Sequence, residues 1–214
     1  MLKTVRIIFS KTGRAKYVSH LDLMRSMTRA MRRSEIPLWY TEGFNRHPYL
    51  TFAAPLSLGQ EGLRESMDIR LEEDVDYKQL IHRLNEVLPA GIVVIDAFDA
   101  VAKVKELTAA EYTVFLSCSG ATVRSLLERP TIEVEKRTKK KTMKTIDLKP
   151  YFTNAEVVDG EGDTCRMEVT LPCGSAENVN PALFVTALSA FLNSEIGSSI
   201  LRKRLTKADG TEFL

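Results

Sequence analysis

The sequence is poor in the features that mark extracellular, membrane-spanning or metal-clustering proteins. Its 214 residues include three cysteines, Cys118, Cys165 and Cys173, which are widely spaced and form no C-x-x-C motif. Such thiols favour neither a disulfide framework, nor a zinc ribbon, nor a cysteine-held iron–sulfur cluster. There is no run of 18 apolar residues and no apolar segment in residues 1–9, so we expect a cytoplasmic protein without a membrane anchor.

Nucleotide-binding and hydrolase motifs are absent as well. The sequence contains no G-x-x-x-x-G-K-[ST], G-x-G-x-x-G, G-x-S-x-G or H-E-x-x-H. Its few histidines lack the spacing that is diagnostic of a metal site. We therefore expect that this chain binds no metal and no cofactor.

Charge is nearly balanced over the whole chain but not along it. The chain holds 30 Lys and Arg against 28 Asp and Glu, a net charge of +2. Counted in blocks, residues 1–50 carry +7, residues 51–100 carry −6, residues 101–150 carry +5 and residues 151–214 carry −4. Basic blocks of this size can supply several phosphate contacts, so the balanced total does not exclude RNA as a partner.

Hydrophobic periodicity in the first hundred residues predicts the order β-α-β-β-α-β. Ser19 and Asp76 are the expected N-caps of two amphipathic helices, and Pro37 ends the first of them. The expected strands are residues 5–10, 49–53, 65–71 and 92–95. This order is the ferredoxin-like split βαβ motif.

The second half predicts the same order with one insertion. Strands are expected at residues 112–116, 131–134, 143–148, 165–171 and 199–205, and helices at 121–128 and from Asn180-Pro181 onward. The strands 131–134 and 143–148 flank a basic turn and belong to an extra hairpin or arm between 131 and 163. We therefore expect an α+β protein with tandem ferredoxin-like domains and antiparallel sheets. The domains would be residues 1–100 and 110–214, joined through residues 99–111. A single α+β domain with the same elements is the alternative.

The first predicted helix places its arginines on one side. Four of them fall within an arc of about 100° beside the apolar face: Arg25, Arg29, Arg32 and Arg33. The guanidinium fork suits phosphate or carboxylate oxygens. Asp22 and Glu35 are the only acids in that helix, which leaves positive charge unpaired. The alternative is a solvated helix face, with Glu61, Glu65 and Asp68 as further pairing partners.

A second basic segment spans residues 136–144, in which six of nine residues are cationic and none is acidic. We expect it on a hairpin or an arm, with Lys139, Lys140 and Lys141 at its centre. It predicts either a grip on a phosphate backbone or a solvated strand edge that lysine protects from pairing.

Two histidines lie near the arginine helix in sequence. His20 stands at the start of that helix, where main-chain N–H groups favour anions. His47 lies in the turn Gly43-Phe44-Asn45-Arg46-His47-Pro48. If helix start and turn meet, His20, Asp22, Asn45 and His47 could bind a phosphate or act as acid and base. Otherwise Asp22 caps the helix and Asn45 and His47 brace the turn.

Several runs carry a resemblance to a known family. They are Phe9-Ser10-Lys11-Thr12-Gly13, Tyr17-Val18-Ser19-His20-Leu21-Asp22-Leu23-Met24-Arg25, Arg29-Ala30-Met31-Arg32-Arg33, Gly43-Phe44-Asn45-Arg46-His47-Pro48, Pro55-Leu56-Ser57-Leu58-Gly59 and Glu65-Ser66-Met67-Asp68. They look like the radical-SAM-associated (radical-SAM-linked) protein family, a bacterial domain of unknown function. Arg46 departs from the pattern, since the family is expected to favour proline there. The resemblance implies a radical-SAM protein as partner and assigns no reaction.

Together, the block charges and the resemblance favour a non-catalytic RNA- or phosphate-binding module that accompanies a radical-SAM protein. The site would consist of the helix arginines, Asn45, Arg46 and the 139–141 lysines. Two alternatives stay open. One is an RNA-processing or RNA-modifying enzyme that uses His20 and His47, and the other is a protein–protein scaffold.

Overall fold

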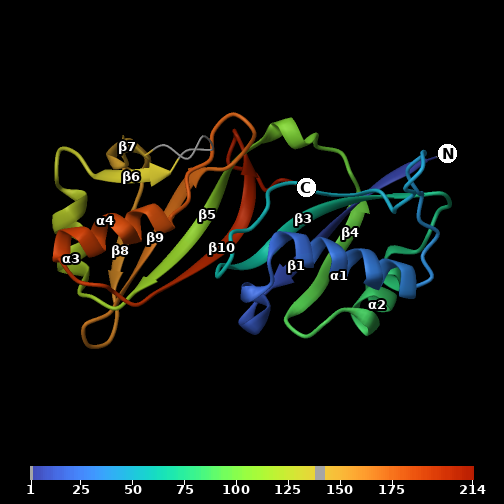
Figure 1. Cartoon of the computed structure of the whole chain (residues 1–214), viewed down its shortest axis with the longest axis horizontal. Helices are drawn as coiled ribbons and strands as arrows, with labels where there is room; N and C mark the ends of the chain where they lie inside the picture. Colours follow the sequence, from blue (N-terminus) through green and yellow to red (C-terminus); the bar gives the residue numbers. More distant parts are fainter. Residues whose placement is uncertain (1, 138–142) are drawn as a thin grey trace. The chain divides into compact units, whose positions relative to one another are not determined.

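The computed structural model of the protein describes residues 2–137 and 143–214 and has a mixed α+β fold. The chain divides into two compact units, whose elements are labelled in Figure 1. Unit 1 comprises residues 1–107 and 202–214, and unit 2 comprises residues 108–201. Four α-helices occur in the described residues, and none of them is long and apolar enough to cross a membrane.

Unit 1 is built on a mainly antiparallel sheet. Its strands are β1 (Lys3–Lys11), β2 (Leu50–Phe52), β3 (Glu61–Leu71), β4 (Ile92–Asp99) and the part of β10 (Ser198–Lys207) that begins at Arg202. The order is β4-β1-β3-β10, and the short β2 also pairs with β3. Helices α1 (His20–Arg33) and α2 (Tyr77–Val87) connect the strands, together with the 3₁₀ turns η1 (Gly13–Tyr17) and η2 (Val104–Glu106).

Both helices of unit 1 begin where the sequence predicts. The Ser19 hydroxyl accepts a hydrogen bond from the main-chain N–H of Asp22 at 3.2 Å. At α2, the Asp76 carboxylate accepts from the main-chain N–H of Lys78 at 2.7 Å. These side chains satisfy N–H groups that have no partner inside the helix, and the two predicted N-caps are therefore confirmed.

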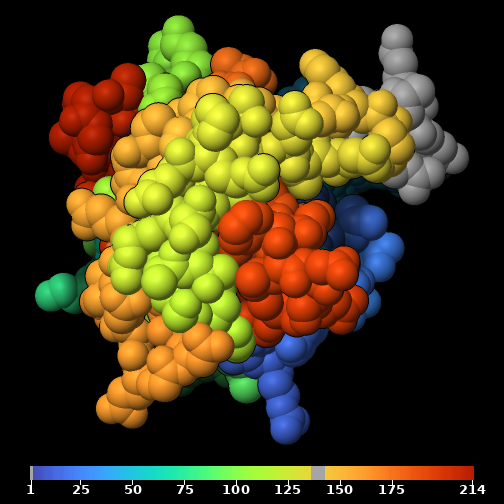
Figure 2. All heavy atoms as spheres, turned by 90° about the vertical axis from the view of Figure 1, so that its left-hand side faces the viewer, coloured from blue at the N-terminus to red at the C-terminus, as the bar shows by residue number. Residues whose placement is uncertain are grey.

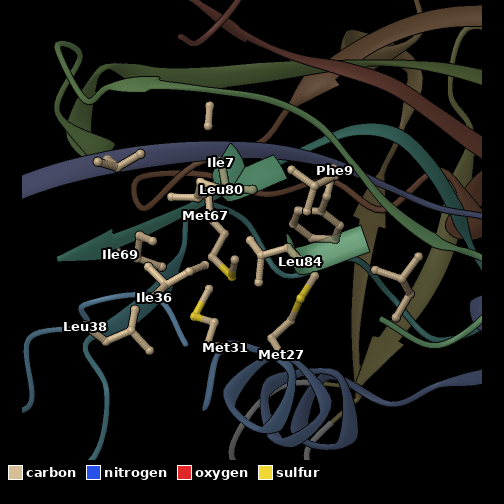
Figure 3. Close-up of a cluster of buried hydrophobic side chains, with 14 of the residues drawn as sticks. Ile7, Phe9, Met27, Met31, Ile36, Leu38, Met67, Ile69, Leu80 and Leu84 are labelled. Carbon is tan, nitrogen blue, oxygen red and sulfur yellow. The ribbon is translucent and has the colours of Figure 1, made fainter. Parts of the chain in front are cut away.

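The core of unit 1 lies between its sheet and the two helices (Figure 3). Met31 of α1 points toward Met67 of β3, and Met27 lies near Leu84 of α2. These side chains are almost completely buried, and burial of each stabilises the fold by about 1.5–3 kcal/mol. Because this apolar stripe faces the sheet, the remaining sides of α1 face outward.

Unit 2 repeats the alternation of strands and helices. Its elements are β5 (Leu107–Leu116), α3 (Gly120–Leu127), β6 (Glu133–Arg137), β7 (Met143–Asp147), η3 (Lys149–Tyr151), β8 (Glu156–Asp159), β9 (Cys165–Pro172) and α4 (Ala182–Leu192). The first residues of β10 complete its sheet, in the order β10-β5-β9-β8. Strands β6 and β7 form a separate two-stranded hairpin.

Helices α3 and α4 lie side by side in unit 2, as Figure 2 shows at the centre of the view. Strand β6 of the hairpin also contacts α4. Buried residues alternate along β9, with Cys165, Met167 and Val169 inward and Arg166 exposed between them. One face of the sheet therefore packs against the helices, and the opposite face presents Arg166.

Two segments can be compared with the sequence-based expectation. The extra hairpin expected between residues 131 and 163 is present as β6–β7, and the turn η3 and the strand β8 follow it as further elements. The C-terminal residues 202–214, which the sequence pattern grouped with the second half, pack with unit 1. Phe213 is buried there, and its N–H donates to the carbonyl of Leu205 at 2.9 Å.

Candidate functional site

Helix α1 presents the predicted arginine face. Its apolar residues Leu23, Met27 and Met31 are buried, whereas all four arginines are exposed. A helix with 3.6 residues per turn separates these two sets around its axis. The sequence-derived placement of the arginines on an outer face of α1 is therefore what the structure shows.

Two of the four arginines have local partners. The Arg25 guanidinium forms an ion pair with the Asp22 carboxylate at 3.1 Å. Arg33 donates to the carbonyl of Val87 at 2.7 Å and thereby ties the end of α1 to the end of α2. Both contacts are local to unit 1, and they reduce what these two side chains can offer to a ligand.

Arg29 and Arg32 differ from the other two. Neither forms an ion pair or a hydrogen bond with any residue that the structure describes, and both are exposed. They are three residues apart on the helix, a spacing that brings side chains to the same face about 5–6 Å apart at Cβ. They therefore form a pair of unpartnered guanidinium groups open to solvent.

Asp22 acts in the helix cap. The Ser19 hydroxyl donates to the Asp22 carboxylate at 2.7 Å, and this bond, together with the Arg25 ion pair, lowers the carboxyl pKa below its usual value. The group is thus ionised at neutral pH and accepts hydrogen bonds. It is suited to holding the start of α1 and not to donating a proton there.

The two candidate histidines lie in different surroundings. His20 packs edge-on against the Phe52 ring, with 5.2 Å between ring centroids. His47 is held in its own turn, with Nδ1 3.0 Å from the carbonyl of Asn45 and 3.2 Å from the Thr41 hydroxyl. His20 therefore contacts a residue of β2, whereas these contacts of His47 lie within its own turn.

The imidazoles of His20 and His47 share no partner among the described residues. The turn that carries His47 also exposes the side chains of Asn45 and Arg46. A bridge between Tyr40 and Pro48 closes this turn at its base. The remaining predicted residues, Lys139, Lys140 and Lys141, lie outside the described residues.

A buried ion pair in unit 1 escaped the sequence analysis. Arg6 of β1 binds the Asp68 carboxylate through two hydrogen bonds, at 2.8 Å from Nε and 2.9 Å from Nη2. Nη2 also donates to the carbonyl of Ala102 at 2.8 Å, and the Phe213 ring covers the guanidinium at 4.0 Å. The Arg6 side chain is almost completely buried.

A second buried pair joins β3 to β10. The Arg202 guanidinium binds the Glu65 carboxylate through both its Nε and Nη2, and Nη2 also donates to the carbonyl of Ala54 at 2.7 Å. Nearby Lys11 is almost fully buried, with Nζ 3.3 Å from the carbonyl of Lys16. Burial lowers the pKa of the Lys11 ammonium, while the Glu65 charge raises it.

These pairs correct one expectation. The acids of β3 were offered as partners of the α1 arginines, but Glu65 binds Arg202, Asp68 binds Arg6, and Glu61 accepts from the main-chain N–H of Gly13 at 2.9 Å. Period-2 alternation shows which face of a strand a side chain occupies, but not which distant segment covers that face. The acids are therefore not available to neutralise Arg29 and Arg32.

A hollow of about 570 Å³ lies in unit 2, where β5 ends and β9 begins. Its lining includes Phe115, Val158, Arg166 and the hydroxyl-bearing Ser117 and Ser199. None of these residues is among the site residues predicted from the sequence. The one available signal was the position of Phe115 and Arg166 on the outward side of their predicted strands.

The thiols near this hollow, Cys118 and Cys165, are buried. Burial raises the pKa of Cys165 to about 11, and the neighbouring Cys118 thiol adds to the effect. Within the described part of the chain, no three His, Cys, Asp or Glu side chains gather in a cluster that could hold a metal ion. The groups that line the hollow and could contact a ligand are the Arg166 guanidinium, hydroxyls and the exposed Phe115 ring.

Comparison with curated proteins finds no match for this chain. Among solved structures, the chain is similar to one titled "Crystal Structure of an Unknown Protein from Galdieria sulphuraria". The two share 12% sequence identity over 94% of this chain and 99% of that chain, with a TM-score of 0.28, which is too low to support an argument. A family described as "Uncharacterized protein conserved in bacteria (DUF2344)" matches residues 4–181, and the chain belongs to this family.

Proposed function

We propose that this protein is a non-catalytic RNA-binding module that accompanies a radical-SAM enzyme in the bacterial cytoplasm. The observation that carries the RNA part is the unpartnered pair Arg29 and Arg32 on the exposed side of α1. Two exposed guanidinium groups on one helix face can bind successive phosphates, because each offers a planar fork of N–H donors.

A non-catalytic role is favoured over an RNA-processing enzyme. The alternative needs His20 and His47 in one site, yet one packs on Phe52 and the other hydrogen-bonds within its own turn. Acid–base catalysis needs both groups within hydrogen-bond reach of the same substrate. Asp22 caps the start of α1 and pairs with Arg25, so its contacts are local to that helix.

We also propose that each unit is a ferredoxin-like domain. In unit 1, the elements β1-α1-β2-β3-α2-β4 have β1 and β3 as central strands, with β4 beside β1 and β2 beside β3. In unit 2, β5-α3-β8-β9-α4-β10 follow the same scheme, and the hairpin β6–β7 is an insertion. The same strand order in both units supports a tandem arrangement.

The radical-SAM partner is proposed from the sequence resemblance. The three cysteines of this chain are all buried, and Cys118 and Cys165 lie near one another. Any iron–sulfur chemistry would therefore belong to the partner. Co-purification of the tagged protein from a bacterium that encodes both would recover the radical-SAM protein; its absence from the eluate under low-salt conditions would contradict this part.

RNA binding is tested by fluorescence anisotropy with a labelled single-stranded RNA at several salt concentrations. The variant Arg29→Gln/Arg32→Gln removes the two unpartnered guanidinium groups. The control Lys78→Gln/Arg83→Gln removes the same charge from the exposed side of α2 in the same unit. We expect the first variant to weaken binding about tenfold or more and the control to have little effect.

The salt dependence gives a second readout. Loss of two phosphate contacts makes the slope of log K against log salt less steep by about 1.4 for a single strand. A wild-type protein that binds no RNA at about 50 mM salt would overturn the proposal, since phosphate contacts are strongest at low salt. Equal affinity and slope in the two variants would overturn the assignment to Arg29 and Arg32.

A further inference from the structure

The face of the unit 2 sheet that carries Phe115 and Arg166 is open near the end of β5, where both side chains are exposed. Helices α3 and α4 pack against the other face, and the hollow of about 570 Å³ lies on the open one, at the end of β5. Pockets that take small ligands have volumes of about 300–1,000 Å³. The hollow is thus large enough for one nucleotide.

Three side chains form a row across this open face. In the strand register, Phe115 of β5 pairs with Arg166 of β9, which pairs in turn with Val158 of β8. Directly paired side chains lie about 4.5–5.5 Å apart at Cβ. Phe115 is 45% exposed, Val158 is 42% exposed, and the Arg166 side chain is 54% exposed. An aromatic ring thus lies open to solvent beside a guanidinium group.

The charges around the hollow favour an anionic ligand with a flat apolar part. Arg166 has one loose ion pair, at 3.9 Å to Glu168, so its guanidinium can turn to a phosphate without breaking a tight contact. The acid in the lining, Asp159, is already bound by Arg124 at 2.6 Å. The hydroxyls of Ser117 and Ser199 add hydrogen-bonding groups that a base edge or a ribose can use.

We propose that this hollow binds one nucleotide of a single-stranded RNA, with its base stacked on Phe115 and its phosphate on Arg166. Exposed aromatic side chains on an open sheet are a common platform for unpaired bases, and each stacked base contributes about 1–3 kcal/mol. The inference rests on the proposed RNA-binding function and adds a second contact point, which reads a base in addition to phosphates.

The test uses the whole 214-residue chain and a labelled single-stranded RNA that contains one 2-aminopurine. The fluorescence of 2-aminopurine falls when the base stacks. The variants are Phe115→Leu and Arg166→Gln. Their matched controls are Phe191→Leu and Arg129→Gln, because Phe191 is 40% exposed on α4 and Arg129 lies over its ring. Circular dichroism spectra checked at the same concentration establish that each variant is folded.

We expect Phe115→Leu to abolish the quenching and to weaken binding about fivefold or more, since a leucine cannot stack. Arg166→Gln makes the salt slope less steep by about 0.7 and keeps part of the quenching. The two controls retain wild-type values. RNA that binds and quenches equally in Phe115→Leu and Phe191→Leu overturns this inference and leaves the proposed function intact.

Two further outcomes separate the remaining possibilities. If no RNA binds to the wild type at low salt, the proposed function fails, and this inference fails with it. If uridine monophosphate or adenosine monophosphate competes with the RNA at equal concentration, the hollow is a site for free nucleotides, and the assignment to single-stranded RNA is overturned. Competition only at a large excess is the result that supports it.

Discussion

Replacement of Asp68 by alanine should destabilise unit 1 far more than loss of a surface acid. The Asp68 carboxylate is the only acidic group that binds the Arg6 guanidinium among the described residues, at 2.8 and 2.9 Å. Arg6 is almost completely buried, and after the change its remaining contacts are the carbonyl of Ala102 and the Phe213 ring. A cation would then stay buried without its counterion.

The expected loss of unfolding free energy follows from the burial of Arg6. Removing one partner of a buried ion pair costs about 3–5 kcal/mol, because the other charge is left uncompensated. The exposed pair Lys3–Asp74, with 3.2 Å between its charged atoms, belongs to the class worth about 0.2–1 kcal/mol. Domains of this size are stable by about 5–15 kcal/mol, so Asp68→Ala removes a large share and Asp74→Ala a small one.

A double replacement distinguishes the cost of an unpaired buried charge from the loss of the contact itself. Arg6→Met with Asp68→Leu removes both charges and keeps apolar volume beneath Phe213. Because exchange of a whole buried ion pair for apolar residues is often neutral or stabilising, the double variant should unfold at a higher denaturant concentration than Asp68→Ala. A simple additive loss would instead place the double variant below it.

Urea unfolding followed by tryptophan fluorescence suits this measurement. Trp39 is the only tryptophan and lies in unit 1, where its ring is 6.2 Å from that of Tyr49, so its signal reports the unit that contains the mutation. A loss below about 1 kcal/mol for Asp68→Ala, equal to that for Asp74→Ala, would refute the reasoning. It would mean that Arg6 is not held as a buried cation.

Two pH-linked predictions concern unit 2. Burial raises the pKa of Cys165 to about 11, so its thiolate at pH 8 is about a hundredfold scarcer than that of an ordinary thiol, and Ellman's reagent should label it slowly until urea is added. The thiol of the unfolded chain ionises at a lower pH than the buried thiol of the folded protein. The free energy of unfolding should therefore decrease as the pH rises from 9 to about 11, and this decrease should be absent in Cys165→Ala. Hydrogen bonds from the main-chain N–H groups of Ile132 and Lys149 lower the pKa of Asp147 in the folded protein. The ionised carboxylate therefore stabilises the fold above pH 3.8, and this stabilisation is lost as the pH falls through the lowered pKa of the folded state. Asp147→Asn should flatten this acid limb in circular dichroism melts, and an unchanged limb would contradict the assignment.

Local signals in the sequence were sufficient for the helices of unit 1 and for the arginine face. Ser19 and Asp76 are caps whose partners lie two or three residues away, so the pattern contains the whole interaction. The positions of Arg29 and Arg32 follow from helical geometry alone. What the pattern could not supply is the partner of Arg33, because the carbonyl of Val87 comes from a different helix.

Contacts between distant segments were beyond the sequence. The pattern predicts a strand over residues 65–71, but it does not show that Arg6 of β1 binds Asp68 or that the Phe213 ring covers Arg6. Phe213 is distant from Arg6 in the sequence, and no local pattern predicts that its ring packs on Arg6. The Phe115–Arg166 pair was missed for the same reason, since it depends on the register between β5 and β9.

The sheets of the two units use the face away from their helices in opposite ways. In unit 1, Arg6 and Asp68 on that face are sealed by Ala102 and Phe213, so their charges serve stability. In unit 2, the ring of Phe115 remains open. Mutations on the two faces should therefore have different effects. Asp68→Ala lowers the unfolding free energy and leaves base quenching in the folded protein unchanged. Phe115→Leu abolishes base quenching and leaves the unfolding free energy nearly unchanged. A variant of either face that changed both quantities together would show that the two faces do not have these separate roles.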